Sequence, residues 1–207
     1  MKKIILTGFQ PFGGYSYNPT QDLVAHFKSE YFKINGIEII GIVLPCTYYG
    51  AFEELSKLID REKPDAIIST GLSSKVRGIR FETTFKNRMQ SKYKDAGGLK
   101  PNGKRLISVA DIPKKLSATA NNLFLANMLS TEKIPFEISD NANAFICNSL
   151  AYLTTKKILD EGLKTRNLFI HIPWTNEYKL QLGKKGKLFF INEVDLHTAI
   201  ELIAENI

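Results

Sequence analysis

The stretch Lys3-Ile4-Ile5-Leu6-Thr7-Gly8 is an apolar run that ends in glycine, and it is followed by a turn and then by Asn18-Pro19. A short apolar run bounded by glycine is typical of a buried β-strand. Asparagine followed by proline supplies a helix N-cap and a first helical residue, so we predict a helix from Pro19 to about Lys33. The beginning of the chain is therefore a strand followed by a helix.

The same order recurs along the rest of the chain. Alternating strands and helices favour a largely parallel sheet that is covered by helices on both faces. The chain has 207 residues and contains no repeat or linker, so we expect residues 1–207 to form one domain, a three-layer α/β/α fold with a twisted central sheet. We predict further strands at 37–43, 65–70, 136–139 and 168–172, and helices at 49–60, 113–129, 144–159 and 192–207, the last with Val194, Leu196, Ile200 and Ile203 toward the core.

The alternation is interrupted between Gly71 and Arg105, in a segment rich in glycine, serine and basic residues. Long connections in compact domains are usually functional or locally structured. We predict a hairpin excursion at 81–93, anchored by Phe81 and Phe85, and a loop at 95–103.

The composition is that of a soluble globular protein, with 43% hydrophobic and 24% charged residues. No apolar run is long enough for a membrane span, and the run at 4–6 is too short for a signal peptide, so we expect a cytoplasmic protein without a membrane partner. The net charge is +7. Since the only dense basic cluster is Lys184, Lys185 and Lys187, a solvated basic surface is favoured over nucleic-acid binding.

The two cysteines, Cys46 and Cys147, are too few for a disulfide framework, and a structural zinc site would need distant ligands, so we expect no metal. Cys147 lies at the start of a predicted helix. Unpaired backbone N–H groups and the positive end of the helix dipole favour a thiolate there, and the same N–H groups can hold an oxyanion. Cys147 is therefore a candidate nucleophile, although the local sequence fits a small apolar core residue equally well.

His171 and Glu82 are the candidate partners of that thiol. His171 ends an apolar strand, and therefore lies at the carboxyl edge of the sheet, where open α/β folds bind their ligands. Glu82 lies between Phe81 and Thr83 in the irregular segment, where a carboxylate can orient an imidazole. Taken alone, His171 fits a hydrogen-bonded core histidine, and Glu82 an exposed loop residue.

The turn Thr7-Gly8-Phe9-Gln10-Pro11-Phe12-Gly13-Gly14 separates the first strand from the first helix. Its glycine spacing does not match the dinucleotide-binding fingerprint, and Phe9 and Phe12 occupy positions where a phosphate needs bare backbone. Two aromatic rings suit a flat, mostly apolar ligand, such as a five-membered lactam.

These segments together resemble the pyroglutamyl-peptidase (pyrrolidone-carboxylate peptidase) family. The resemblance runs along nearly the whole chain in the family's order. It includes the opening turn with Asn18-Pro19, Leu44-Pro45, the segment from Pro64 to Gly71, Glu82 with Asn87, the cysteine segment from Ser139 to Asn148, and Phe169-Ile170-His171-Ile172-Pro173.

The resemblance implies a Cys147–His171–Glu82 triad that removes N-terminal pyroglutamate from peptides through a thioester, without a metal or cofactor. It also implies a lactam pocket formed by Phe9, Phe12, Phe145 and Ile146, and a homo-oligomer, by default a homotetramer.

The chain departs from the family pattern around the triad. Asn143 replaces a glycine before the cysteine, and asparagine is the best substitute for glycine in a left-handed conformation. Thr83 and Phe85 replace a basic residue and an alanine. Lys92 falls where an arginine is expected to polarise the substrate carbonyl, and keeps the charge but not the planar fork. A divergent member with weak activity or another small amide substrate, and a non-catalytic binding module, remain alternatives.

Overall fold

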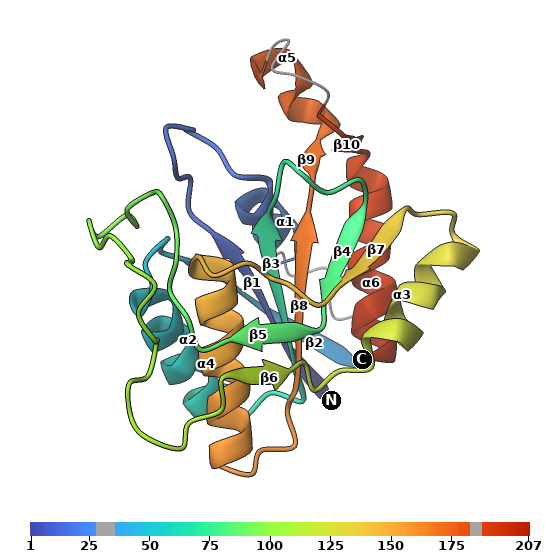
Figure 1. Cartoon of the computed structure of the whole chain (residues 1–207). Coiled ribbons are helices and arrows are strands. Elements are labelled where there is room, and N and C mark those ends of the chain that lie inside the picture. Colours follow the sequence, from blue (N-terminus) through green and yellow to red (C-terminus); the bar gives the residue numbers. More distant parts are fainter. Residues whose placement is uncertain (28–35, 183–187) are drawn as a thin grey trace.

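The protein is described here by a computed structural model, which covers residues 1–27, 36–182 and 188–207. Its centre is a six-stranded sheet in the order β2-β1-β3-β8-β4-β7 (Figure 1). The first four strands run parallel, whereas β4 is antiparallel to β8 and parallel to β7. Their bounds are β2 Ile37–Leu44, β1 Lys2–Phe9, β3 Ala66–Leu72, β8 Arg166–Ile172, β4 Ile79–Glu82 and β7 Phe136–Ser139.

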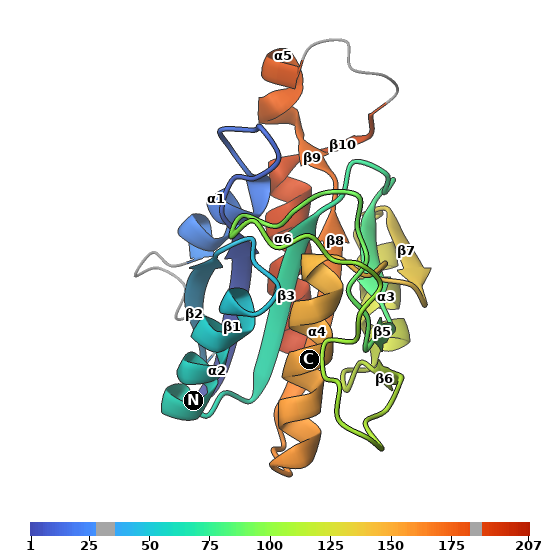
Figure 2. The same cartoon turned by 60° about the vertical axis from the view of Figure 1, so that its left-hand side comes forward.

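Helices cover both faces of this sheet, as Figure 2 shows from the side. Alternate strand residues face opposite sides, so Ile4 and Leu6 join one apolar core and Ile5 joins the other. The first core packs against α1 (Pro19–Phe27), α3 (Asn122–Thr131) and α6 (Glu193–Asn206), and the second against α2 (Gly50–Glu62) and α4 (Ile146–Asp160). The predicted three-layer fold with a largely parallel sheet is therefore confirmed.

The first helix begins where the sequence predicts it. The backbone N–H of Thr20 donates to Asn18 Oδ1 at 3.1 Å, and Asn18 Nδ2 donates to the carbonyl of Gln10 at 3.2 Å. Asn18 therefore caps the helix and ties together the two ends of the β1–α1 loop. The predicted helix end near Lys33 and the cluster of Lys184, Lys185 and Lys187 lie outside the described residues.

The predicted hairpin at 81–93 is wrong. β4 enters the main sheet, while β5 (Thr84–Lys86) pairs with β6 (Lys115–Ser117), far along the chain. Phe81 and Phe85 thus anchor opposite faces of the sheet. The partner of β5 is not local, so the residues after Phe85 carry no signal for it.

Two further expectations about helices are wrong. Residues 115–117 form β6, and α3 begins later because Asn121 Oδ1 accepts the N–H of Phe124 at 3.2 Å and caps the helix there. Val194 is exposed in the first turn of α6, while Leu196, Ile200 and Ile203 are buried as predicted.

A small satellite of structure follows β8 and projects beyond the carboxyl edge of the sheet (Figure 1). It consists of β9 (Trp174–Thr175), η1 (Asn176–Tyr178), α5 (Lys179–Leu182) and β10 (Phe190–Ile191), with its own apolar cluster around Trp174. None of these elements was predicted from the sequence. No helix in the described part of the chain is long and apolar enough to cross a membrane.

Candidate active site

Cys147 is the second residue of α4, and the turn before this helix brings it toward the sheet. Asn143 adopts a left-handed conformation with φ 65°, as expected for an asparagine in place of glycine, and Phe145 is the extended N-cap. No side chain caps this helix end. The first backbone N–H groups of a helix have no partner within it, so those of α4 are available to a ligand.

His171 and Glu82 lie in direct contact. His171 Nδ1 and Glu82 Oε1 are 2.8 Å apart, and Glu82 is fully buried. The sheet register explains the contact: Glu82 pairs with Phe169, two residues before His171, so the two polar side chains are diagonal neighbours on one face. The second carboxylate oxygen, Oε2, has no hydrogen-bond partner within the described residues.

Gly71 makes room for the sulfur of Cys147 beside the imidazole. Gly71 pairs with His171 across β3 and β8. A Cβ atom added to Gly71 would lie 2.8 Å from Cys147 Sγ and 3.3 Å from His171 Cδ2, the carbon next to Nε2. The thiol and the Nε2 side of the ring therefore border the same small space, while Nδ1 faces Glu82.

Asn148 fixes the start of α4 against β5 and the residues that follow it. Its Oδ1 accepts the N–H of Lys86 at 2.7 Å, and its Nδ2 donates to the carbonyls of Lys86 and Arg88 at 2.9 and 3.3 Å. Because Asn148 is fully buried and follows Cys147 directly, these bonds restrain the position of the thiol.

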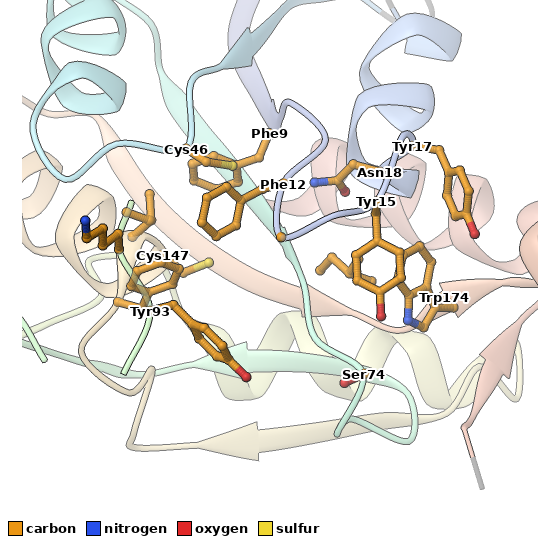
Figure 3. Close-up of a pocket in the computed structure, with 15 residues that line it drawn as sticks. Phe9, Phe12, Tyr15, Tyr17, Asn18, Cys46, Ser74, Tyr93, Cys147 and Trp174 are labelled. Atoms are coloured by element: carbon orange, nitrogen blue, oxygen red, sulfur yellow. The ribbon is translucent and has the colours of Figure 1, made fainter. Parts of the chain in front are cut away.

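A cavity of about 700 Å³ opens in front of Cys147 (Figure 3). Phe12 and Phe145 lie beside the cysteine with ring centroids 5.8 Å apart, and Phe145 also meets Tyr48 edge-on. The cavity is lined by all four residues that the resemblance implies for a lactam pocket, namely Phe9, Phe12, Phe145 and Ile146.

Lys92 and the substituted residues near Glu82 lie elsewhere. Lys92 is exposed and is not among the cavity-lining residues; its Nζ lies 4.9 Å from the ring centroid of Tyr93, which does line the cavity with Lys94. Thr83 donates its N–H and hydroxyl to the carbonyl of Ser139 at 2.7 and 3.1 Å. Phe85 is fully buried in the core beneath α4, so both replacements have structural roles.

Burial raises the pKa of the Cys147 thiol above its ordinary value, and nearby Cys46 and Glu82 raise it further, whereas its own backbone N–H lowers it. The lowering expected from the helix N-terminus is therefore outweighed by burial. Burial likewise raises the pKa of Cys46 to about 12, and Cys46 Sγ donates to the carbonyl of Gln10 at 3.4 Å. Only Cys147 of the two is beside an imidazole in the described structure.

Sequence reasoning missed one side of the cavity, which we call the aromatic wall and define as Tyr15, Tyr17 and Trp174. Tyr15 and Trp174 have ring centroids 5.1 Å apart, and Tyr17 and Trp174 5.7 Å. Tyr17 stacks on Tyr178 at 4.4 Å. The available signal was the pair of tyrosines after Gly13-Gly14, but their partner Trp174 comes from the other end of the chain.

An acidic cluster lies behind the aromatic wall. Tyr178 donates its hydroxyl to Asp22, and a small hollow next to it is lined by Asp22, Glu177 and Glu193 together with His26 and His197. Burial, followed by the neighbouring Glu177 and Asp22, raises the pKa of Glu193 to about 7, while a hydrogen bond from Thr175 opposes the shift. Among the described residues, no group of three His, Cys, Asp or Glu side chains could hold a metal ion.

The fold and this site together define a class, a cysteine-type hydrolase built on a three-layer α/β domain. Comparison with known proteins specifies the family. The model of the pyroglutamyl peptidase family matches residues 2–205, so the chain belongs to that family.

Individual relatives agree with this assignment. The pyrrolidone-carboxylate peptidases of Oceanobacillus iheyensis and Thermococcus kodakarensis are 35% and 32% identical to this chain, over 98% and 99% of it and 97% of their own length. The solved pyrrolidone carboxyl peptidase of Thermococcus litoralis matches with a TM-score of 0.90 at 28% identity, over 99% of this chain and 92% of that one. Pyroglutamyl peptidase I of Bacillus amyloliquefaciens matches with 0.89 at 25% identity, over 100% and 96%.

Proposed function

We propose that this protein hydrolyses the bond after an N-terminal pyroglutamyl residue, with Cys147 as nucleophile, His171 as general base and acid, and Glu82 as the group that orients the imidazole. The observation that carries the proposal is the arrangement around His171. Nδ1 contacts Glu82 at 2.8 Å, and the sulfur of Cys147 borders the other side of the ring at the edge of the cavity.

The chemistry follows from the protonation state of the thiol. Because burial raises the pKa of the Cys147 thiol, the sulfur needs a base, and its proton passes to His171 Nε2 as the sulfur attacks the pyroglutamyl carbonyl carbon. Glu82 stabilises the resulting imidazolium through Nδ1. The N–H groups at the start of α4 donate to the oxyanion.

The second half of the reaction uses the same groups in reverse. His171 gives its proton to the departing amine, and the C–N bond breaks to leave a thioester on Cys147. A water molecule, deprotonated by His171, then attacks the thioester carbonyl, which releases pyroglutamate and restores the thiol. No external oxidant or cofactor enters this sequence.

We assign the pyroglutamyl ring to Phe9, Phe12, Phe145 and Ile146. Their position next to the thiol supports this, because the carbonyl carbon that the sulfur attacks is attached directly to the lactam ring. A site whose backbone groups pair the lactam amide rejects substrates that lack it, by up to about 10⁴-fold. We also propose that the protein acts in the cytoplasm as a homotetramer, which light scattering after size-exclusion chromatography would test.

The test is turnover combined with mapped alkylation. The wild-type protein should cleave a pyroglutamyl chromogenic amide but not the proline, alanine or glutamine amides, and Cys147→Ala should abolish cleavage. Iodoacetamide inactivation should track modification of Cys147, as located by mass spectrometry. Inactivation that tracks Cys46, or cleavage of a non-lactam amide alone, would overturn the proposal.

A further inference from the structure

The aromatic wall of the cavity has no part in the hydrolytic steps. Tyr15 and Tyr17 come from the β1–α1 loop, and Trp174 follows β8. Trp174 and Tyr17 pack on each other and on Tyr178, whereas Tyr15 is 37% exposed. In the aromatic wall, Tyr17 and Trp174 are therefore held by packing, and Tyr15 is the partly exposed ring.

The cavity is larger than a lactam ring requires. A volume of about 700 Å³ is in the range of sites that enclose a drug-sized ligand rather than a single five-membered ring. With the ring held beside Phe12 and Phe145, much of this volume remains, and the aromatic wall borders it.

The position of Cys147 divides the cavity between the two parts of a substrate. The residue that forms the thioester lies on one side of the scissile carbonyl, and the leaving peptide lies on the other. Phe145 and Ile146 directly precede Cys147 in the chain, so the lactam side is next to the start of α4. Figure 3 shows the sulfur of Cys147 and the ring of Tyr15 on opposite sides of the open centre. The leaving residue is thereby directed toward Tyr15 and Trp174.

We propose that the aromatic wall binds the side chain of the residue that follows pyroglutamate, and that it selects aromatic and large apolar side chains there. This subsite rests on the proposed peptidase function. Aromatic rings add both buried apolar area and favourable ring contacts when they pack on other rings. Among the described lining residues Lys94 is the one with a charge, so a basic second residue finds no carboxylate in the lining.

The experiment compares kcat/KM for pyroglutamyl-phenylalanine amide, pyroglutamyl-alanine amide and pyroglutamyl-lysine amide. The wild-type protein should prefer phenylalanine over alanine by about tenfold or more, with lysine the poorest. Tyr15→Ala should reduce the ratio of phenylalanine to alanine at least about threefold, mainly through KM, and Tyr15→Phe should keep it. Phe124→Ala, an exposed aromatic residue on α3 outside the cavity, is the matched control and should change neither rate nor ratio.

The results for the subsite can be separated from those for the peptidase function. Efficient turnover with equal rates for phenylalanine and alanine would refute the subsite and leave the peptidase function standing. An equal loss on both peptides in Tyr15→Ala would also refute it, since Tyr15 would then act on the pyroglutamyl residue or on the loop. Absence of cleavage of all three peptides would instead refute the proposed function.

Discussion

Gly71 borders the space that the thiol of Cys147 and the imidazole of His171 share, so replacing Gly71 with alanine tests this arrangement directly. The added Cβ would lie 2.8 Å from Cys147 Sγ, 3.1 Å from Phe169 Cζ and 3.3 Å from His171 Cδ2. Ordinary contacts between such atoms are about 3.5–4.0 Å, so the sulfur must retreat by roughly 1 Å. A displacement of that size can lower the rate by about 10²-fold, which is the loss we expect in kcat/KM.

The effect on stability should be much smaller. Overpacking costs about 1–3 kcal/mol, and the loss of glycine from the unfolded chain offsets about 0.4–1 kcal/mol of that cost. The backbone of Gly71 is strand-like rather than left-handed, so alanine adds no strain of its own. At about 2–4 °C for each kcal/mol, the melting temperature should fall by about 10 °C at most.

The assay measures kcat/KM on a pyroglutamyl amide together with the rate of iodoacetamide modification and the thermal midpoint. Gly97→Ala is the matched control, because its added Cβ would meet its nearest neighbours at 3.5 Å, an ordinary distance. It should keep activity and melting temperature near wild type. A folded Gly71→Ala protein that retains kcat/KM within about threefold of wild type would show that Cys147 and His171 do not react across this space.

Three other changes test separate parts of the site. Glu82→Gln should lower kcat by about 10²–10⁴-fold with little change in melting temperature, and near-normal turnover would remove Glu82 from the mechanism. Asn148→Ala should cost about 2–4 kcal/mol in urea denaturation, because it leaves partly buried backbone groups of Lys86 unpaired; a loss below about 0.5 kcal/mol would contradict these hydrogen bonds. The folded-state pKa of Glu193 is raised to about 7, so its ionisation should destabilise the protein as the pH rises from about 4.5 to about 7. Glu193→Gln should therefore raise the melting temperature at pH 8 but not at pH 4. An equal effect at both pH values would refute the raised pKa of Glu193.

Five of the six strands of the main sheet could be predicted because their signals are local, and the exception is β4, whose segment was expected to form a hairpin. Apolar β-branched runs such as 37–43 and 168–172 sit between turn residues, and the structure places strands there. The partner of residues 84–86 could not be predicted, because it is the short segment at 115–117, which contains only one partly buried apolar residue, Leu116. Strand pairing at long range depends on the packing of the whole domain, which a window of sequence does not contain.

In the candidate site, too, local features could be predicted from the sequence and long-range contacts could not. Cys147, His171 and Glu82 stand in segments whose family resemblance is strong, and the structure brings Glu82 against His171 and the thiol beside the ring. The helix start that favours a thiolate at Cys147 is visible in the sequence, whereas the desolvation that raises the pKa of this thiol arises only in the fold. The aromatic wall was missed because Trp174 meets Tyr15 only through the fold.

The direction of β4 explains how one imidazole serves both a carboxylate and a thiol. β4 runs against β8, so its last residue, Glu82, lies level with Phe169 and below His171, away from the cavity. The carboxylate therefore reaches Nδ1 from within the protein, where water cannot compete for it. The thiol comes from the opposite direction, carried by α4 over the space that Gly71 leaves open. Strands and the start of α4 hold all three groups, whereas Tyr15 and Tyr93 of the cavity lining lie in loops. Changes in these loops should then alter which peptides are cleaved, while changes at Gly71, Glu82 or Asn148 should alter how fast every peptide is cleaved.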